Sequence, residues 1–142
     1  MLFRSNPNGV QEGNTVSLDY WYVSPLGTYI AYGISNGGDE MATLYIKDVA
    51  KNVDLADVIV HCRYSGVQWL QDESGFYYTR NARPGTVPQD EEHMHVKVYF
   101  HTLGNNPDDD ELIFGADRPK DDMISIALSP NDQYVGDRKS VV

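Results

Sequence analysis

The sequence has little cysteine and few basic residues, and each shortage excludes a class of structure or function. Cys62 is its only cysteine, so no disulfide can form within the chain and the fold does not depend on an oxidising compartment. The 11 Lys and Arg residues are outnumbered by 21 Asp and Glu, which gives a net charge of −10. Because nucleic-acid affinity comes largely from clustered basic side chains, we expect no binding to DNA or RNA. No apolar run is long enough to span a bilayer, so we expect no membrane partner.

Tyrosine and the β-branched residues are abundant. The 142 residues are 41% apolar and 11% aromatic, which suits one compact domain or a piece of a larger one. The 10 tyrosines and 2 tryptophans favour strands, because aromatic and branched side chains fit a pleated, half-buried surface. No segment has a convincing helical pattern, and residues 41–50 fit a strand and a turn better than a helix. The sequence predicts an all-β fold.

Three segments share a pattern in which a strand end, a polar turn and a second Tyr-rich strand follow one another. They begin at Tyr22 (YVSPLGTYIAYGIS), Val67 (VQWLQDESGFYYTR) and Ile126 (IALSPNDQYV). A second hairpin pattern alternates with the first, as LYIKDVAKN from Leu44 and VYFHTLGNN from Val98. Repeats of roughly 40 to 50 residues with four strands each are typical of β-propeller blades. We therefore predict a partial β-propeller of about two to two and a half four-stranded blades.

The order of these motifs resembles the first blades of the propeller in prolyl oligopeptidases, a family of serine peptidases. The run EGNTVSLDYWYVSPLGTYIAYGISNGGDE is followed by YIKDV, VIVHCRYSGVQWLQDESGFYYTR, HVKVYFHTLGNNPDDDELIF and ISIALSPNDQYV. The resemblance extends from about Gly13 to Val135. It implies a parent protein with a seven-bladed propeller and an α/β-hydrolase domain that carries a Ser, Asp, His triad. In such a parent the propeller caps the active site and admits short peptides, which are cut after proline.

The function implied by the resemblance is substrate gating by a chain that is itself non-catalytic, with the hydrolase domain absent. The implied partners are that α/β-hydrolase domain and short proline-containing peptides, and no cofactor is implied. The compartment is left open between cytoplasm and periplasm, since we expect the true N-terminus to be missing. Two alternatives remain: a standalone propeller-type interaction module, and the propeller of a related peptidase that cuts after basic residues. A downstream Gly-x-Ser-x-Gly followed by Asp and His would exclude the interaction module.

Both ends of the chain resemble translated sequencing adapters. The segment LFRS at residues 2–5 is the translation of CTCTTCCGATCT, and residues 137–142 are what GATCGGAAGAGCGTCGTG encodes. We therefore expect a partial propeller domain at residues 6–135, and sequencing artefacts of a metagenomic fragment at residues 1–5 and 136–142. A propeller needs at least about four blades to close, so the blade count also predicts a fragment. Ordinary polar tails are the alternative.

The segment GISNGG has the Gly-x-Ser-x-Gly spacing of many serine hydrolases, with Ser35 in the nucleophile position. A nucleophile elbow needs a strand, a strained turn and then a helix, whereas here a polar loop leads to another strand. We predict that the chain has no catalytic residue and that Ser35 lies in a hairpin loop. Gly33, Gly37 and Gly38 are then expected to serve the turn.

Two clusters could bind metal ions. His93 and His95 could bind zinc with Glu91 or Glu92, but two imidazoles without a clear third ligand favour a solvated loop. The acidic run at residues 108–111 lacks the alternating ligands and glycine of an EF-hand, which favours a solvated turn. We therefore predict no metal site.

Four further residues are assigned from their chemistry or from the resemblance. Cys62 is expected to be a buried or partly buried structural thiol, and Trp21 and Trp69 are expected to be core residues between blades. In the resembled family, the aromatic residue before Ser in the segment matching RYSGVQW contributes an apolar wall to the substrate site. Tyr64 occupies this position and is our substrate-binding candidate, with plain core packing as the alternative.

Overall fold

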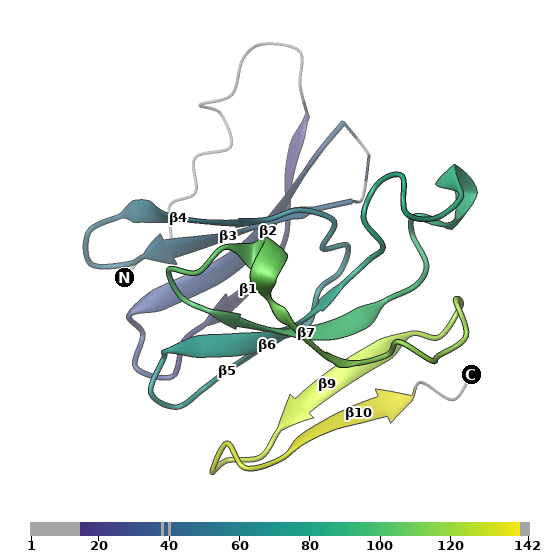
Figure 1. Cartoon of the computed structure of the whole chain (residues 1–142). Helices are drawn as coiled ribbons and strands as arrows, with labels where there is room; N and C mark the ends of the chain where they lie inside the picture. Colours follow the sequence, from purple (N-terminus) through teal and green to yellow (C-terminus); the bar gives the residue numbers. More distant parts are fainter. Residues whose placement is uncertain (1–14, 38, 40, 140–142) are drawn as a thin grey trace.

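The computed structural model describes residues 15–37, 39 and 41–139, which form two four-stranded antiparallel sheets and one two-stranded sheet (Figure 1). Blade 1 contains β1 (Val16–Val23), β2 (Tyr29–Asn36), β3 (Thr43–Asp48) and β4 (Val53–Ile59). Blade 2 contains β5 (Val67–Trp69), β6 (Gly75–Arg80), β7 (Lys97–Thr102) and β8 (Glu111–Phe114). A last hairpin pairs β9 (Ile124–Leu128) with β10 (Val135–Lys139). The predicted partial propeller of two to two and a half blades is confirmed.

Helical structure within the described residues is limited to short 3-10 turns. These turns are η2 (Gln89–Glu91) and η3 (Pro107–Asp109). The strand and turn predicted for residues 41–50 are confirmed, since β3 ends at Asp48 and a turn follows. None of the helices formed by the described residues has the length and apolar character of a membrane span.

The three predicted repeats form the same hairpin turn. The first turn residue accepts a backbone hydrogen bond of 2.9 to 3.1 Å from the N–H three positions later, which belongs to Gly27, Glu73 or Asp132. Each of these three donors has positive φ, at 75°, 61° and 58°. The three copies of this turn directly precede β2, β6 and β10. The turn therefore sets where the second strand of each unit begins.

The core lies between the facing sheets of blades 1 and 2. Its largest contribution from blade 2 is a set of rings, in which Trp69 packs 4.9 Å from Phe76 and 6.0 Å from Tyr29 of blade 1, measured between centroids. The Trp69 indole N–H donates to the carbonyl of Tyr22 at 3.1 Å. The prediction that Trp69 packs between blades is confirmed, and its polar edge is satisfied across the same interface.

Trp21 was predicted to be in the core, and this prediction is wrong, because its side chain is 59% exposed. Successive strand residues point to opposite faces, and the neighbouring Tyr20 and Tyr22 pack against the core cluster between the blades. Trp21 therefore lies on the other face of blade 1. The register places it in one row with Tyr32, Tyr45 and Val58 across the sheet.

The glycine-rich segment around Ser35 also differs from expectation. Ser35 belongs to β2, where it is 6% exposed and pairs with Ser17, so its predicted place in a hairpin loop is wrong. Gly33 is needed for close approach rather than for the turn, because a Cβ there would lie 2.3 Å from the Tyr20 ring. Gly37 takes a positive φ of 60° and serves the turn as predicted, whereas Gly38 lies outside the described residues.

The predicted domain limits of residues 6–135 lie only partly within the described residues. Residues 1–5 lie outside the described residues, as do residues 140–142. At the other predicted artefact, residues 136–139 belong to β10 and pair with β9. The domain limits and the artefact hypothesis stay predictions.

Candidate functional site

Tyr64 lies on the chain that crosses from blade 1 to blade 2, residues 60–66 between β4 and β5. Its side chain is 61% exposed, so the plain core packing considered as its alternative does not describe it. Its backbone has a φ of 46°, in the left-handed region that is uncommon for a tyrosine. A strained conformation of this kind persists only where neighbouring contacts stabilise it, so the crossover must be held by other residues.

Asn81, just after β6, holds the crossover through both its backbone and its side chain. Its N–H donates to the carbonyl of His61 at 2.8 Å, and its Oδ1 accepts from the N–H of Arg63 at 3.1 Å. Its Nδ2 donates to the carbonyl of His93 at 3.0 Å, which ties in the segment before β7. Asn81 is 5% exposed, so these bonds are made away from water and fix the crossover beside β6.

A second set of bonds fixes the residues after Tyr64. The hydroxyl of Ser65 donates to the carbonyl of Thr79 at 2.6 Å, and the N–H of Gly66 donates to the Thr79 hydroxyl at 3.0 Å. The guanidinium of Arg63 lies 5.2 Å from the centroid of the Tyr64 ring. Tyr64 is thus an exposed aromatic ring on a backbone anchored on both sides.

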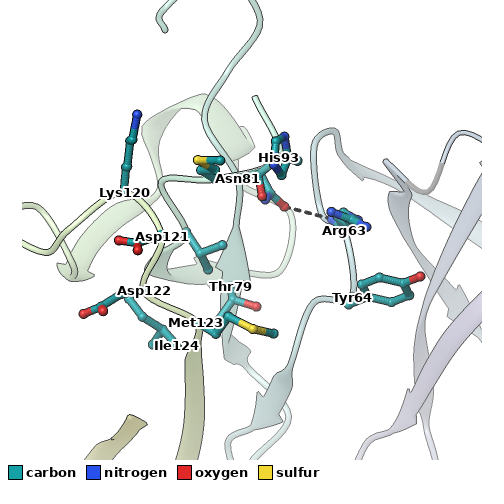
Figure 2. A pocket seen from close by; sticks show the side chains of 12 residues that line it. Arg63, Tyr64, Thr79, Asn81, His93, Lys120, Asp121, Asp122, Met123 and Ile124 are labelled. Atoms are coloured by element: carbon teal, nitrogen blue, oxygen red, sulfur yellow. Dashed lines mark hydrogen bonds between the residues drawn. The ribbon is translucent and has the colours of Figure 1, made fainter. Parts of the chain in front are cut away.

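Tyr64 is one of the residues that line an open pocket of about 330 Å³ (Figure 2). Figure 2 shows Arg63 and Tyr64 on one side and the segment from Lys120 to Ile124 on the other. Met123 on that far side is 71% exposed. The pocket therefore combines aromatic and thioether surface with charged groups, a lining that suits an apolar side chain of a peptide and a polar main chain.

Charged groups at the far side hold two loops together. The Oε1 of Glu91 lies 2.6 Å from the Nζ of Lys120, and its Oε2 lies 2.8 Å from the Nε2 of His95. The hydrogen bond from Lys120 lowers the pKa of Glu91, and the same bond raises the pKa of Lys120. The N–H of His95 also donates to the carbonyl of Lys120 at 2.8 Å. This network fixes the segment of η2 against the loop before β9.

The candidate zinc ligands do not converge. Glu91 and His95 meet Lys120, a cation, and His93 instead lines the pocket beside Tyr64. Among the described residues, no group of three or more His, Cys, Asp and Glu side chains is placed to hold a metal ion.

The acidic run at residues 108–111 contains side chains in two different environments. Asp108 has a side chain that is 65% exposed and lies 3.2 Å from Arg83, as a solvated turn predicts. The side chain of Asp110 is 3% exposed and contacts His101 and Tyr78, so the solvated-turn prediction is wrong for this residue. No sequence signal distinguishes the two, because Asp110 is defined by partners on other strands.

Stacked four-stranded antiparallel blades with an exposed crossover define this chain as part of a β-propeller. The family model described as prolyl oligopeptidase, N-terminal beta-propeller domain, matches residues 6–138. The chain belongs to the prolyl oligopeptidase family, within the propeller of these serine peptidases.

Individual relatives agree with this assignment. The chain is 34% identical over 132 residues to the prolyl endopeptidase of Elizabethkingia meningoseptica, covering 92% of this chain and 18% of the relative. It is 30% identical to prolyl oligopeptidase A of Galerina marginata, covering 92% and 20%. A solved structure from a study of two prolyl endopeptidases superposes with a TM-score of 0.84 at 29% identity, covering 94% of this chain and 20% of that chain. The chain thus spans about a fifth of the length of these relatives.

Proposed function

We propose that this chain is part of the substrate-gating propeller of a serine peptidase that cuts short peptides after proline. The observation that carries the proposal is Tyr64, an exposed aromatic ring on an anchored backbone at the edge of the pocket. The matched relatives are described as prolyl endopeptidases and prolyl oligopeptidases, which favours proline over basic residues. The partner of this surface is the α/β-hydrolase domain of the same parent chain, together with the bound peptide.

The chemistry in the parent is acyl transfer through the serine of the hydrolase domain. The propeller contributes by limiting which peptides reach that serine and by excluding bulk water. Tyr64 and Met123 offer apolar contact to a peptide residue beside the scissile bond, and Arg63 and Lys120 offer cationic donors to main-chain carbonyls. No residue of this chain takes part in bond making or breaking in the proposed mechanism.

Tyr64→Ala in the full-length peptidase tests the proposed contact. Removing an aromatic contact of about 1 kcal/mol raises KM for short proline peptides roughly fivefold. The value of kcat stays unchanged, because the ring binds substrate and transition state alike. Steady-state kinetics with a proline-containing peptide series measure both constants.

Tyr134→Ala is the matched control, since Tyr134 is 72% exposed and lies on the β9–β10 turn rather than at the pocket. It is expected to leave KM unchanged. An unchanged KM in Tyr64→Ala would remove the substrate-binding role of this ring. The peptidase assignment itself is tested separately, by sequencing the gene for a downstream Gly-x-Ser-x-Gly followed by Asp and His.

A further inference from the structure

A buried histidine joins blade 1 to blade 2. His101 on β7 is fully buried, and each of its ring nitrogens meets a carboxylate. Its Nε2 lies 2.7 Å from the Oδ2 of Asp57 on β4 of blade 1. Its Nδ1 lies 2.8 Å from the Oδ1 of Asp110, which stands between η3 and β8 of blade 2. The imidazole therefore bridges one carboxylate from each blade.

The geometry of this bridge requires a proton that a neutral histidine lacks. A neutral imidazole has a single N–H, so its other nitrogen would present a lone pair to a carboxylate oxygen. Both carboxylates also accept a further hydrogen bond, Asp57 from the N–H of Gly104 at 2.8 Å and Asp110 from the hydroxyl of Tyr78 at 2.7 Å. The bridge is satisfied when both ring nitrogens of His101 carry a proton, because each then donates to one carboxylate.

The surroundings of the bridge come from several elements. Phe76 of β6 packs its ring 5.4 Å from that of His101, between centroids, and supplies no charge. Tyr78 of β6 is kept neutral, because burial and the hydrogen bond to Asp110 raise its pKa. Cys62 of the crossover is also neutral, because burial raises its pKa to about 12. Arg80 of β6 interacts electrostatically with both Tyr78 and Cys62. Two carboxylates thus face one imidazolium, with one guanidinium nearby.

We propose that Asp57, His101 and Asp110 form a proton-dependent latch between blade 1 and blade 2. The protonated imidazole donates to both carboxylates, and loss of its proton leaves one carboxylate facing a lone pair. The latch concerns the cohesion of neighbouring blades, so it stands or falls independently of the proposed peptidase function. It places a titratable group at the blade interface, and none of the three residues lines the pocket that includes Tyr64.

The direction of the pH dependence follows from the pKa of His101. Burial acts to lower this pKa, but the hydrogen bonds and charges of Asp110 and Asp57 outweigh burial and raise it above its ordinary value. A group whose pKa is raised on folding stabilises the folded state fully below its unfolded pKa, about 6.5 for histidine. This stabilisation declines as the pH rises through the folded-state pKa.

Nitrogen NMR of the histidine rings in the whole 142-residue chain is the direct test. At about pH 7.5, one unit above the ordinary histidine pKa, both ring nitrogens of His101 are expected to carry a proton. The loss of this signal pair in His101→Gln assigns it. A single ring N–H on His101 at this pH would overturn the proposal, and the number of ring protons is read from the unmodified chain.

Thermal melts of matched variants test how much the latch stabilises the folded chain. His101→Gln is expected to lower Tm by roughly 10 °C at pH 6, because it leaves two buried carboxylates without their cation. Asp57→Asn is expected to lower Tm by less, because His101 keeps its contact with Asp110. Their effects are expected to be less than additive in the double variant, since the two side chains form one interaction. The difference in Tm between His101→Gln and the unmodified chain should decrease as the pH rises to 9. His95→Gln is the control, because its side chain is 28% exposed and Glu91 keeps its ion pair with Lys120 when the imidazole is lost. A difference in Tm that stays constant from pH 6 to pH 9 would also overturn the proposal.

Discussion

Cys62 shows how strongly environment controls a single side chain. The thiol is fully buried, and burial raises its pKa to about 12. The Cys62 backbone is used as well, because its N–H donates to Ala42 at 2.9 Å and its carbonyl accepts from the Tyr20 hydroxyl at 2.6 Å. The predicted buried structural thiol is confirmed, and the residue holds the crossover against blade 1.

The native thiol is therefore expected to react with a disulfide reagent at least about a hundredfold more slowly than an unfolded thiol at pH 8, because both thiolate and access are lacking. The time course of reagent absorbance measures this rate, with the denatured chain as reference. The variant Cys62→Ser carrying Ala50→Cys is the control, since Ala50 is exposed in a turn. Equal rates for the native chain and this control would show that Cys62 is not enclosed.

Residues defined by local chemistry were predictable, and residues defined by distant partners were not. Burial of Cys62 and Trp69 was predicted from side-chain type and is confirmed, whereas the same reasoning failed for Trp21. The role of Asp110 depends on His101, nine positions earlier, and through it on Asp57, 44 positions before His101. No periodic pattern spans such intervals, so the acidic run suggested only solvent. Tyr64 was found through family resemblance, and its role in binding stays a prediction.

The hairpin turns act as connectors between neighbouring units. The carboxylate of Glu73, in the turn of blade 2, accepts from the Ser24 hydroxyl and from the Thr28 hydroxyl at 2.7 Å in the turn of blade 1. Asp132, at the same position in the third turn, accepts through Oδ2 from the N–H of Gln71 at 2.7 Å. The equivalent residue of blade 1 is Gly27, which has no side chain to reach outward. One position of the repeat thus carries each unit's bond to the preceding unit.

Glu73→Ala is expected to lower the free energy of unfolding by about 2 kcal/mol, because it removes a buried charged acceptor from two hydroxyls. Glu73→Gly loses the same bonds but relieves the positive φ of 61°, so it should cost about 1 kcal/mol less. Urea unfolding of the three chains measures these differences. Equal losses in the two variants would contradict the role assigned to backbone strain.

The same turn is expected to lose stability in acid, through Glu73. Burial acts to raise the pKa of Glu73, but hydrogen bonds from Ser24 and Thr28 outweigh it and lower this pKa. The stabilisation is present above the unfolded pKa, about 4.3 for glutamate, and is lost as the pH falls through the folded-state pKa. The difference in stability between the unmodified chain and Glu73→Ala is therefore expected to narrow in acid, whereas the His101 latch weakens in base. Urea melts between pH 3 and pH 7 would show whether the two chains converge.

The order of elements was the most predictable level of the fold. Turn residues and the two alternating hairpin patterns locate the strands, and their repetition gives the blades. What the sequence could not supply is which face of a blade meets a neighbour. The predictions for Ser35 and Trp21 were wrong for related reasons. Pairing with β1 extends β2 through Ser35, and stacking on blade 2 determines which face of β1 is buried.

At the scale of the whole molecule, stacking is one-sided for blade 1. Its inner face packs on blade 2 through Leu44, Ile46 and other buried residues, while its outer face presents Trp21 and Val23, 59% and 54% exposed. In a propeller ring each blade stacks between two neighbours. Among residues 15–37, 39 and 41–139, no sheet covers the outer face of blade 1. Exposed apolar side chains on an uncovered sheet face favour association.

The 142-residue chain on its own is therefore expected to self-associate with rising concentration, and Trp21→Thr with Val23→Thr should reduce this association at least severalfold. Threonine keeps the strand propensity of β1 while removing apolar area from the exposed face. Leu26→Thr is the matched control, because Leu26 is 76% exposed but lies in the turn after β1. Sedimentation velocity over a range of concentrations separates the cases. If the control reduced association as much as the double variant, general surface hydrophobicity and not the outer face of blade 1 would be the cause. If only the double variant acts, the face that a neighbouring blade would cover in a ring is the face through which the isolated chain associates.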